Sequence, residues 1–173
     1  MPPARRARAR LAVRASPRRL TFRAGGDPYD DLIDDDVTHG PYPLRAVGYV
    51  ESPLTDPEDA PRQGFEGAPD AWIAFDADVL EAMGDLRPGE DVFVLTWLHE
   101  ARRDVLAVHP RDDPTVPLHG VFSTRSPDRP NPIGLHRVQI VEVDGNRMRV
   151  RPLEAIDGTP VVDVKPVLRD EGA

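Results

Sequence analysis

The segment "LHRVQIVEVDGNRMRVRPL", residues 135–153, predicts two β-strands joined by a tight turn. Asp144 and Gly145 occupy the turn, and Asp-Gly is a strong hairpin signal because both positions tolerate a positive φ angle. The runs "LHRVQIVEV" and "RMRVRPL" on either side of this turn are typical of β-strands. A hairpin joins antiparallel neighbours, so this segment indicates a fold built at least partly from antiparallel β-strands.

Further short strands are predicted on both sides of the hairpin. They lie at residues 44–50, 72–75, 91–99, 105–109 and 120–124, and a second Asp-Gly pair at 157 and 158 precedes one more strand-like run. The run "DVFVLTWLH", residues 91–99, is long, apolar and rich in β-formers. It is expected to be a buried central strand.

One short helix is predicted between two of these strands. Asp76 stands where a helix N-cap would, and Leu80, Met83 and Leu86 follow at helical spacing. Six to eight short strands with one helix predict a mainly β fold, a single antiparallel β-barrel domain. A doubly wound sheet is not expected, because strands and helices do not alternate.

The first 40 residues differ from the rest in charge. Eight arginines and no acid lie within residues 1–23, and six aspartates without a basic residue lie within 24–40. High charge with little periodicity predicts a poorly ordered extension at 1–40, followed by the barrel domain at 41–168 and a tail at 169–173. The arginine-rich arm would suit RNA binding, and a misplaced start codon would also produce it; both interpretations stay open.

The remainder of the chain is acidic. The whole protein carries a net charge of −8, and residues from 41 onward carry 14 basic against 24 acidic side chains. Such a domain repels a nucleic-acid backbone at long range. A local basic patch is the expected exception, and its candidate members are Arg102, Arg103, Arg111, Arg125 and Arg129.

Several classes of protein are disfavoured by what the sequence lacks. Without cysteine there is no disulfide, thiolate metal ligand or thiol nucleophile. No apolar run has the length of a membrane span, so no membrane contact and a cytoplasmic location are expected. The chain contains no GxSxG, no GxxxxGK[ST] and no GxGxxG, and its five histidines do not match HExxH, so no metal site is expected.

The segment "STRSPDRPNP", residues 123–132, is a stiff and basic loop. Its three prolines restrict their own backbone angles and those of the preceding residues. A rigid turn that caps the sheet would explain them. The alternative is that Arg125 and Arg129 are held ready for an anionic or planar partner, because a guanidinium offers a fixed fork of donors.

Four segments together resemble one family. "VGYVESPL" (47–54), "PRQG" (61–64), "GVFSTRSPDRPNPIGL" (120–135) and "DGTPVVDVKPVL" (157–168) occur in the order found in TsaA-like proteins, the TrmO tRNA methyltransferases. The third motif is long and specific. The resemblance covers residues 44–168, and Val167 departs from it because many relatives have an aromatic residue there.

The resemblance implies an S-adenosylmethionine-dependent enzyme on a β-barrel, a homodimer that methylates the exocyclic amine of threonylcarbamoyladenosine beside the tRNA anticodon. By motif position, the family's cofactor contacts fall on Arg62, Gln63, His99, Glu100, Arg125, Leu135, Asp157, Gly158, Thr159 and Pro160. No catalytic residue is assigned; His99, His119 and Asp157 are each candidates for a general base. The alternatives are a regulatory module that binds S-adenosylmethionine and a methyltransferase acting on a small molecule.

Overall fold

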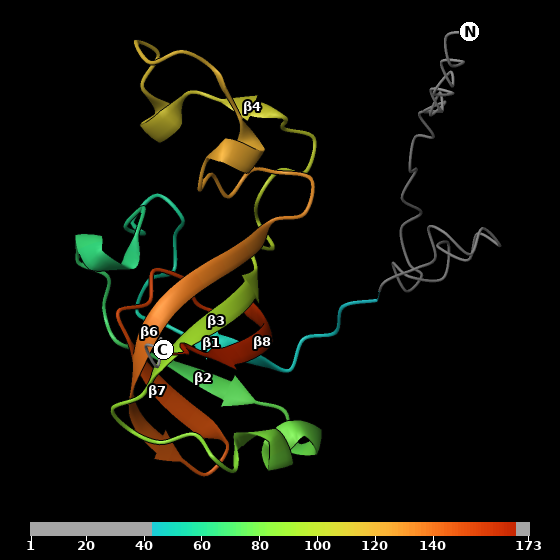
Figure 1. Ribbon diagram of the computed structural model, residues 1–173, viewed down its shortest axis with the longest axis vertical. Coiled ribbons are helices and arrows are strands. Elements are labelled where there is room, and N and C mark those ends of the chain that lie inside the picture. Colours follow the sequence, from blue (N-terminus) through green and yellow to red (C-terminus); the bar gives the residue numbers. More distant parts are fainter. Residues whose placement is uncertain (1–42, 169–173) are drawn as a thin grey trace, which may run out of the picture. The chain divides into compact units, whose positions relative to one another are not determined.

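The computed structural model describes residues 43–168 of the chain (Figure 1). The chain divides into two units, Met1–Pro43 and Leu44–Ala173. The extension expected at residues 1–40 and the tail expected at 169–173 lie outside the described residues. Within residues 43–168, no helix has the length and apolar character needed to cross a membrane.

Six strands form the main sheet, and each pairs with its neighbours in antiparallel fashion. They are β1 (Gly48–Glu51), β2 (Ala71–Phe75), β3 (Asp91–Trp97), β6 (Ile133–Asp144), β7 (Arg147–Arg151) and β8 (Pro160–Pro166). Their order is β1-β2-β7-β6-β3-β8, and β8 pairs back with β1, so the sheet closes on itself. The prediction of a mainly antiparallel β structure is confirmed.

The core fills the inside of this closed sheet. Along β3 the inward-facing residues are buried, as Val92, Val94 and Thr96 are, while the residues between them are only partly covered. The strand predicted at residues 91–99 is thus present over Asp91–Trp97 and is buried on its inner face, while its outer face is only partly covered. β3 is central in its pairing, with β6 on one side and β8 on the other, but a closed sheet leaves its outer face open.

The predicted helix exists as a 3₁₀-helix, η2 (Ala77–Met83), with Asp76 at its N-cap. The Asp76 side chain makes no capping hydrogen bond there. The described residues also contain three shorter 3₁₀-helices that the sequence did not predict: η1 (Gly64–Glu66), η3 (Pro110–Asp112) and η4 (Val121–Ser123).

One predicted strand is largely replaced by η4. Of residues 120–124 only Gly120 belongs to a strand, the two-residue β5 (His119–Gly120), which pairs with β4 (Ala107–Val108). The reason is local. The hydroxyls of Ser123 and Thr124 donate to the carbonyls of Gly120 and Val121, and such bonds compete with those of a strand ladder.

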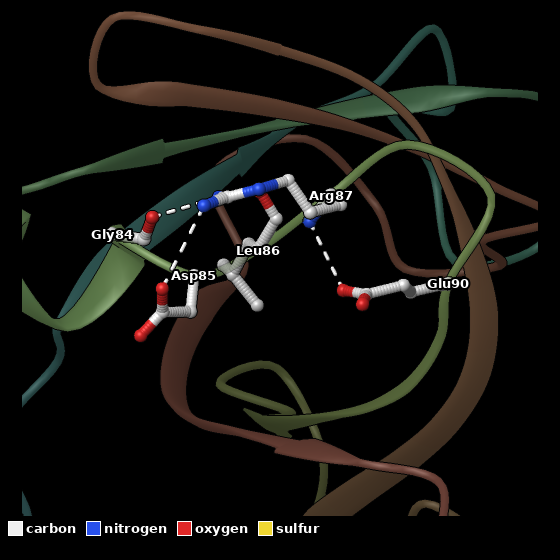
Figure 2. A network of polar contacts seen from close by, with 5 residues as sticks. All are labelled: Gly84, Asp85, Leu86, Arg87 and Glu90. Carbon is white, nitrogen blue, oxygen red and sulfur yellow. Dashed lines mark hydrogen bonds and ion pairs between the residues drawn. The ribbon is translucent and has the colours of Figure 1, made fainter.

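The turn between η2 and β3 is fixed by polar contacts to one arginine. Figure 2 shows the Arg87 guanidinium reaching the carbonyl oxygen of Gly84 at 2.7 Å and the Asp85 carboxylate at 3.6 Å. The backbone N–H of Arg87 donates to the Glu90 carboxylate at 3.0 Å. Two backbone hydrogen bonds then tie this turn to Ile140 of β6, which sets the starting point of β3.

Strand direction gathers three connections at one end of the closed sheet. Because neighbours are antiparallel, β1, β7 and β3 end where β2, β8 and β6 begin. The connections at this end, called the loop end below, are residues 52–70, 98–132 and 152–159. In Figure 1 the connection 98–132, which carries β4, projects beyond the ends of β3 and β6.

Gly134 of β6 faces inward, where a larger residue would not fit. A Cβ atom at this position would lie 2.3 Å from Thr96 Oγ1 and 2.6 Å from His136 Nε2. These two atoms are 2.9 Å apart and form a hydrogen bond between buried side chains. The glycine therefore leaves the space that this polar contact needs.

We expect Gly134→Ala to lower the free energy of unfolding by about 1–3 kcal/mol, because the added methyl group overfills a packed interior. Gly120→Ala is the matched control: its Cβ would meet nothing nearer than 4.0 Å, and its φ of −58° suits alanine. Chemical denaturation measures both. Equal stability of the two variants would show that the space beside Thr96 is not needed.

Candidate functional site

A cavity lies where β6 runs beyond the end of β7. It has a volume of about 410 Å³, within the range of small-molecule sites. Its walls come from β3, β6, the end of β7 and all three connections of the loop end. Among its lining residues are Gln63, Gly64, Phe65, Asp91, Phe93, Arg125, Leu135, His136, Arg137, Gln139, Arg151 and Glu154.

The proline and arginine loop is held rigid from within by Arg129. Its guanidinium donates to three backbone carbonyls of the loop, those of Ser126 at 2.8 Å, Val121 at 3.1 Å and Thr124 at 2.7 Å. Backbone carbonyl groups are costly to bury without a donor, and Arg129 supplies a donor to three of them. The alternative that Arg129 is held ready for a ligand is not supported, because its Nε and Nη2 donors are engaged within the loop.

Arg125 has the opposite role in the same loop. Its side chain is exposed and lines the cavity, and within residues 43–168 no hydrogen bond or ion pair holds it. A guanidinium on a stiff backbone presents five donors in a fixed plane. The loop thus combines an arginine that builds the structure with another that is left available to a ligand.

Of the other predicted contacts, Gln63 and Leu135 line the same cavity. Arg62 is beside Gln63 but does not line it; Arg62 forms an ion pair of 3.2 Å with Asp112. A second ion pair, between Arg111 and Glu66, links the same two connections. Both pairs are exposed at the surface and contribute little to stability, but they bring the 52–70 and 98–132 connections together.

The predicted pair His99 and Glu100 follows β3 at the loop end without lining the cavity. Both residues are exposed, and His99 Nε2 lies 3.9 Å from Glu100 Oε1. They stand at the start of the 98–132 connection, because the strand predicted to end at His99 ends at Trp97. The structure does not bring them into the group around Arg125.

The DGTP segment ties two connections of the loop end to each other. The backbone N–H groups of Asp157 and Gly158 donate to the carbonyls of Leu54 and Val50, and the Asp157 carboxylate accepts from the Ser52 N–H at 3.0 Å. Thr159 is buried, and Pro160 begins β8 opposite Tyr49. These four residues do not line the cavity.

The expected basic patch is mostly neutralised. Arg102 pairs with Asp128 at 2.9 Å, Arg111 pairs with Glu66, and Arg129 is occupied within its loop. Arg103 stacks over Trp97, with 4.8 Å between its guanidinium carbon and the ring centre. Among the five arginines proposed for the patch, only Arg103 and Arg125 have no ion pair or hydrogen bond within the described part of the chain.

Two functional groups in the cavity were not predicted, His136 and Glu154. His136 Nδ1 lies 2.9 Å from Glu154 Oε1, and the ring is 5% exposed. The sequence signal was weak: His136 stands in an ordinary strand run, and Glu154 lies three residues before the DGTP motif. Within residues 43–168, no group of three or more metal-ligating side chains could hold a metal ion.

Comparison of the sequence with known proteins identifies a family. The model of the tRNA-methyltransferase O N-terminal domain matches residues 49–171. An S-adenosyl-L-methionine-binding protein of Archaeoglobus fulgidus is 47% identical over 125 residues, which cover 70% of this chain and 86% of that protein. A probable S-adenosyl-L-methionine-binding protein of Methanothermobacter thermautotrophicus is 45% identical over 127 residues, covering 73% and 90%.

Solved structures agree with this result. TrmO from Pseudomonas aeruginosa superimposes with a TM-score of 0.60 at 26% identity, and a further TrmO structure does so with 0.61 at 28%. Each comparison covers 77% of this chain but only 57% and 61% of the solved chains. The chain thus spans somewhat more than half the length of the solved proteins that it matches.

The contrast between the two arginines of the loop can be tested by stability. Arg129→Ala should lower the free energy of unfolding by about 1–3 kcal/mol, because three hydrogen bonds to loop carbonyls are lost and only the Val121 carbonyl keeps another side-chain donor, the Thr124 hydroxyl. Arg125→Ala should change it by less than about 0.5 kcal/mol, as expected of an exposed side chain without partners. Urea denaturation compares the two. A larger loss for Arg125→Ala would reverse the assigned roles.

Proposed function

Because the chain belongs to the family of the tRNA-methyltransferase O N-terminal domain, we propose that it is an S-adenosylmethionine-dependent tRNA methyltransferase. The proposed reaction is methylation of N6 of threonylcarbamoyladenosine next to the anticodon. The names of the relatives from Archaeoglobus fulgidus and Methanothermobacter thermautotrophicus support the cofactor, and the TrmO structures support the reaction class. The observation that carries the proposal is the Arg125 guanidinium, which has no partner within residues 43–168 and lines a cavity of about 410 Å³.

The residues around the cavity fit the chemistry of this cofactor. S-adenosylmethionine has a carboxylate, which suits the free donors of Arg125, and an adenine ring, which suits the apolar surfaces of Phe65 and Leu135. Its ammonium group needs an acceptor, and Gln63, whose side-chain amide oxygen can accept a hydrogen bond, lines the same cavity. Gly64 leaves open the space beside the Glu154 carboxylate, since a Cβ there would lie 3.0 Å from Glu154 Oε2.

The proposed contacts include the other positions of the family motifs. Arg62, His99, Glu100 and the DGTP residues stand in the three connections of the loop end, next to the cavity walls. When bound, the cofactor supplies an electrophilic methyl group. The protein aligns the acceptor nitrogen with it, and alignment provides much of the acceleration in such a displacement.

We further infer that the closed six-stranded sheet is the β-barrel of the family and that the protein acts as a cytoplasmic homodimer. The support for a dimer is an apolar surface on the 98–132 connection. Leu106, Leu118 and Phe122 are 70%, 63% and 84% exposed. Exposed apolar side chains gathered on one segment are typical of a protein contact.

A second candidate function is a regulatory module that binds S-adenosylmethionine without transferring its methyl group. The names of the relatives favour it, since they mention binding alone. The neutralised surface also favours it, because an RNA-binding face normally carries unpaired positive charge. Both candidate functions require binding of S-adenosylmethionine, and only the methyltransferase requires tRNA as its substrate.

Cofactor binding can be measured directly by calorimetry. Arg125→Ala should weaken the affinity for S-adenosylmethionine by about 1–3 kcal/mol, or about 5- to 150-fold, through loss of a charge-assisted hydrogen bond. Arg103→Ala is the matched control, because Arg103 also lacks an ion pair but stacks on Trp97 away from the cavity lining. Equal affinity of wild type and Arg125→Ala would remove Arg125 from the site.

The reaction itself is tested by incubating the protein with S-adenosylmethionine and unmodified or threonylcarbamoylated tRNA, followed by mass spectrometry of the nucleosides. A mass increase of one methyl group on threonylcarbamoyladenosine alone is the expected result. Cofactor binding without methylation of either tRNA would contradict the proposed reaction and favour the regulatory module.

A further inference from the structure

A line of three polar side chains runs from the interior of the closed sheet to the cavity. Thr96 is fully buried, His136 is 5% exposed, and the Glu154 side chain is 19% exposed. Thr96 Oγ1 lies 2.9 Å from His136 Nε2, and His136 Nδ1 lies 2.9 Å from Glu154 Oε1. Both ring nitrogens of the buried histidine thus have a polar neighbour.

The apolar surroundings of Thr96 and His136 make it costly in free energy to bury these polar side chains. The inward neighbours are apolar, with Val94 and Val138 buried beside the histidine along their strands. Polar groups in such surroundings cost free energy when their hydrogen bonds are imperfect. His136 Nδ1 has no well-aligned hydrogen bond within the described residues, although the Glu154 carboxylate is close enough for one.

The second carboxylate oxygen of Glu154, Oε2, lies near Gly64 and not near the histidine. A Cβ added to Gly64 would lie 3.0 Å from Glu154 Oε2 and 3.2 Å from the ring of Pro152. Gly64, His136 and Glu154 all line the cavity; Oε2 is the carboxylate oxygen on the Gly64 side, and Oε1 faces the histidine. The carboxylate therefore connects the buried histidine with the space where a ligand would bind.

The charges around this carboxylate come from several elements. Arg137 and Asp91 line the cavity from β6 and β3 and pair with each other at 2.8 Å. Arg125 and Arg151 line it from the 98–132 connection and from β7, and within residues 43–168 neither pairs with a carboxylate. Glu154 is thus the carboxylate of this cavity that no arginine neutralises in the described part of the chain.

We propose that Glu154 Oε2 accepts the proton that a nitrogen nucleophile bound in this cavity loses when it is methylated, and that His136 and Thr96 position the Glu154 carboxylate. The inference rests on the proposed function. In the step the new nitrogen–carbon bond forms, the sulfur–carbon bond breaks with its electron pair on sulfur, and the proton of the nitrogen passes to Glu154. Charge balances, because a sulfonium and a carboxylate become a thioether and a carboxylic acid.

The methylation needs a proton acceptor because of the chemistry of the attacking nitrogen. The nitrogen of a carbamoylated amine shares its lone pair with a carbonyl group, so it is a poor nucleophile until its proton leaves. A carboxylate within reach contributes typically 10²- to 10⁴-fold to such a step. His136 Nδ1 lies 2.9 Å from Oε1 of that carboxylate, and Oε2 is the oxygen proposed to receive the proton.

Glu154→Gln tests the proton acceptor, because the amide keeps the shape and cannot take the proton. We expect kcat to fall by about 10²-fold or more. We also expect the ¹⁵Nδ1 chemical shift of His136 in the free protein to change, because that nitrogen loses its carboxylate neighbour. An unchanged kcat, or an unchanged His136 shift, would overturn the proposal.

Thr96→Val tests the positioning role without changing Glu154. The loss of the hydroxyl should lower kcat and displace the acid limb of its pH profile, with KM unchanged, and Thr96→Ser should restore both. Thr115→Val is the matched control, since Thr115 bonds Asp113 in an exposed turn outside the cavity. Thr96→Val with the pH profile and kcat of wild type would refute a positioning role.

The outcomes separate this inference from the proposed function. Wild-type protein that methylates tRNA, with Glu154→Gln equally active, overturns the proton acceptor alone. Wild-type protein that neither binds S-adenosylmethionine nor methylates tRNA overturns both. Wild-type protein that methylates tRNA, with Glu154→Gln impaired and its cofactor affinity within about twofold of wild type, supports both.

Discussion

The pairing of the last strand, β8, with the first, β1, governs where every other part of the described chain can lie. All neighbours around the ring are antiparallel, so the connections that follow β1, β3 and β7 leave from one end. Residues more than 100 positions apart then meet, as where the Ser52 N–H donates to the Asp157 carboxylate. The cavity exists because these three connections meet over the long strand β6.

At the loop end, the two arginines of the loop at residues 123–132 have different roles, and one of them makes the loop rigid. Arg129 satisfies three carbonyl groups and, with the prolines, leaves the loop few alternatives. Less conformational entropy then remains to be lost when Arg125 binds a ligand. Arg129 commits its Nε and Nη2 donors to the backbone of the loop, whereas Arg125 has no partner within residues 43–168.

Electrostatics around the cavity differ from those of the outer surface. On the surface most arginines described are paired, as Arg102 is with Asp128 and Arg137 with Asp91, which leaves little free positive charge. At the cavity Arg125 is free of a carboxylate, and Glu154 contacts a buried histidine and not an arginine. A positively charged and a negatively charged side chain thus line the same cavity, which suits a ligand that has a carboxylate, an ammonium and a sulfonium group.

The local parts of this protein could be predicted from sequence, because each depends on a few adjacent residues. The Asp-Gly pair marks the hairpin between β6 and β7, although Asp144 ends β6 and the turn residues are Gly145 and Asn146. Asp76 precedes η2, and the motifs around Arg125 and Asp157 identify the family. Where side chains competed with the backbone for hydrogen bonds, as at Ser123 and Thr124, local prediction of a strand was wrong.

What depends on residues far apart in the chain was decided only by the tertiary structure. Sequence could not separate Arg125 from Arg129, since their roles follow from which carbonyls the folded loop presents. Sequence also could not show that Thr96, His136 and Glu154 lie next to one another. Their contacts require the space that Gly134 leaves on β6, and they require the β7–β8 connection to bring Glu154 next to His136. Patterns of neighbouring residues determine strands and turns, whereas a cavity arises from the register and closure of the whole sheet.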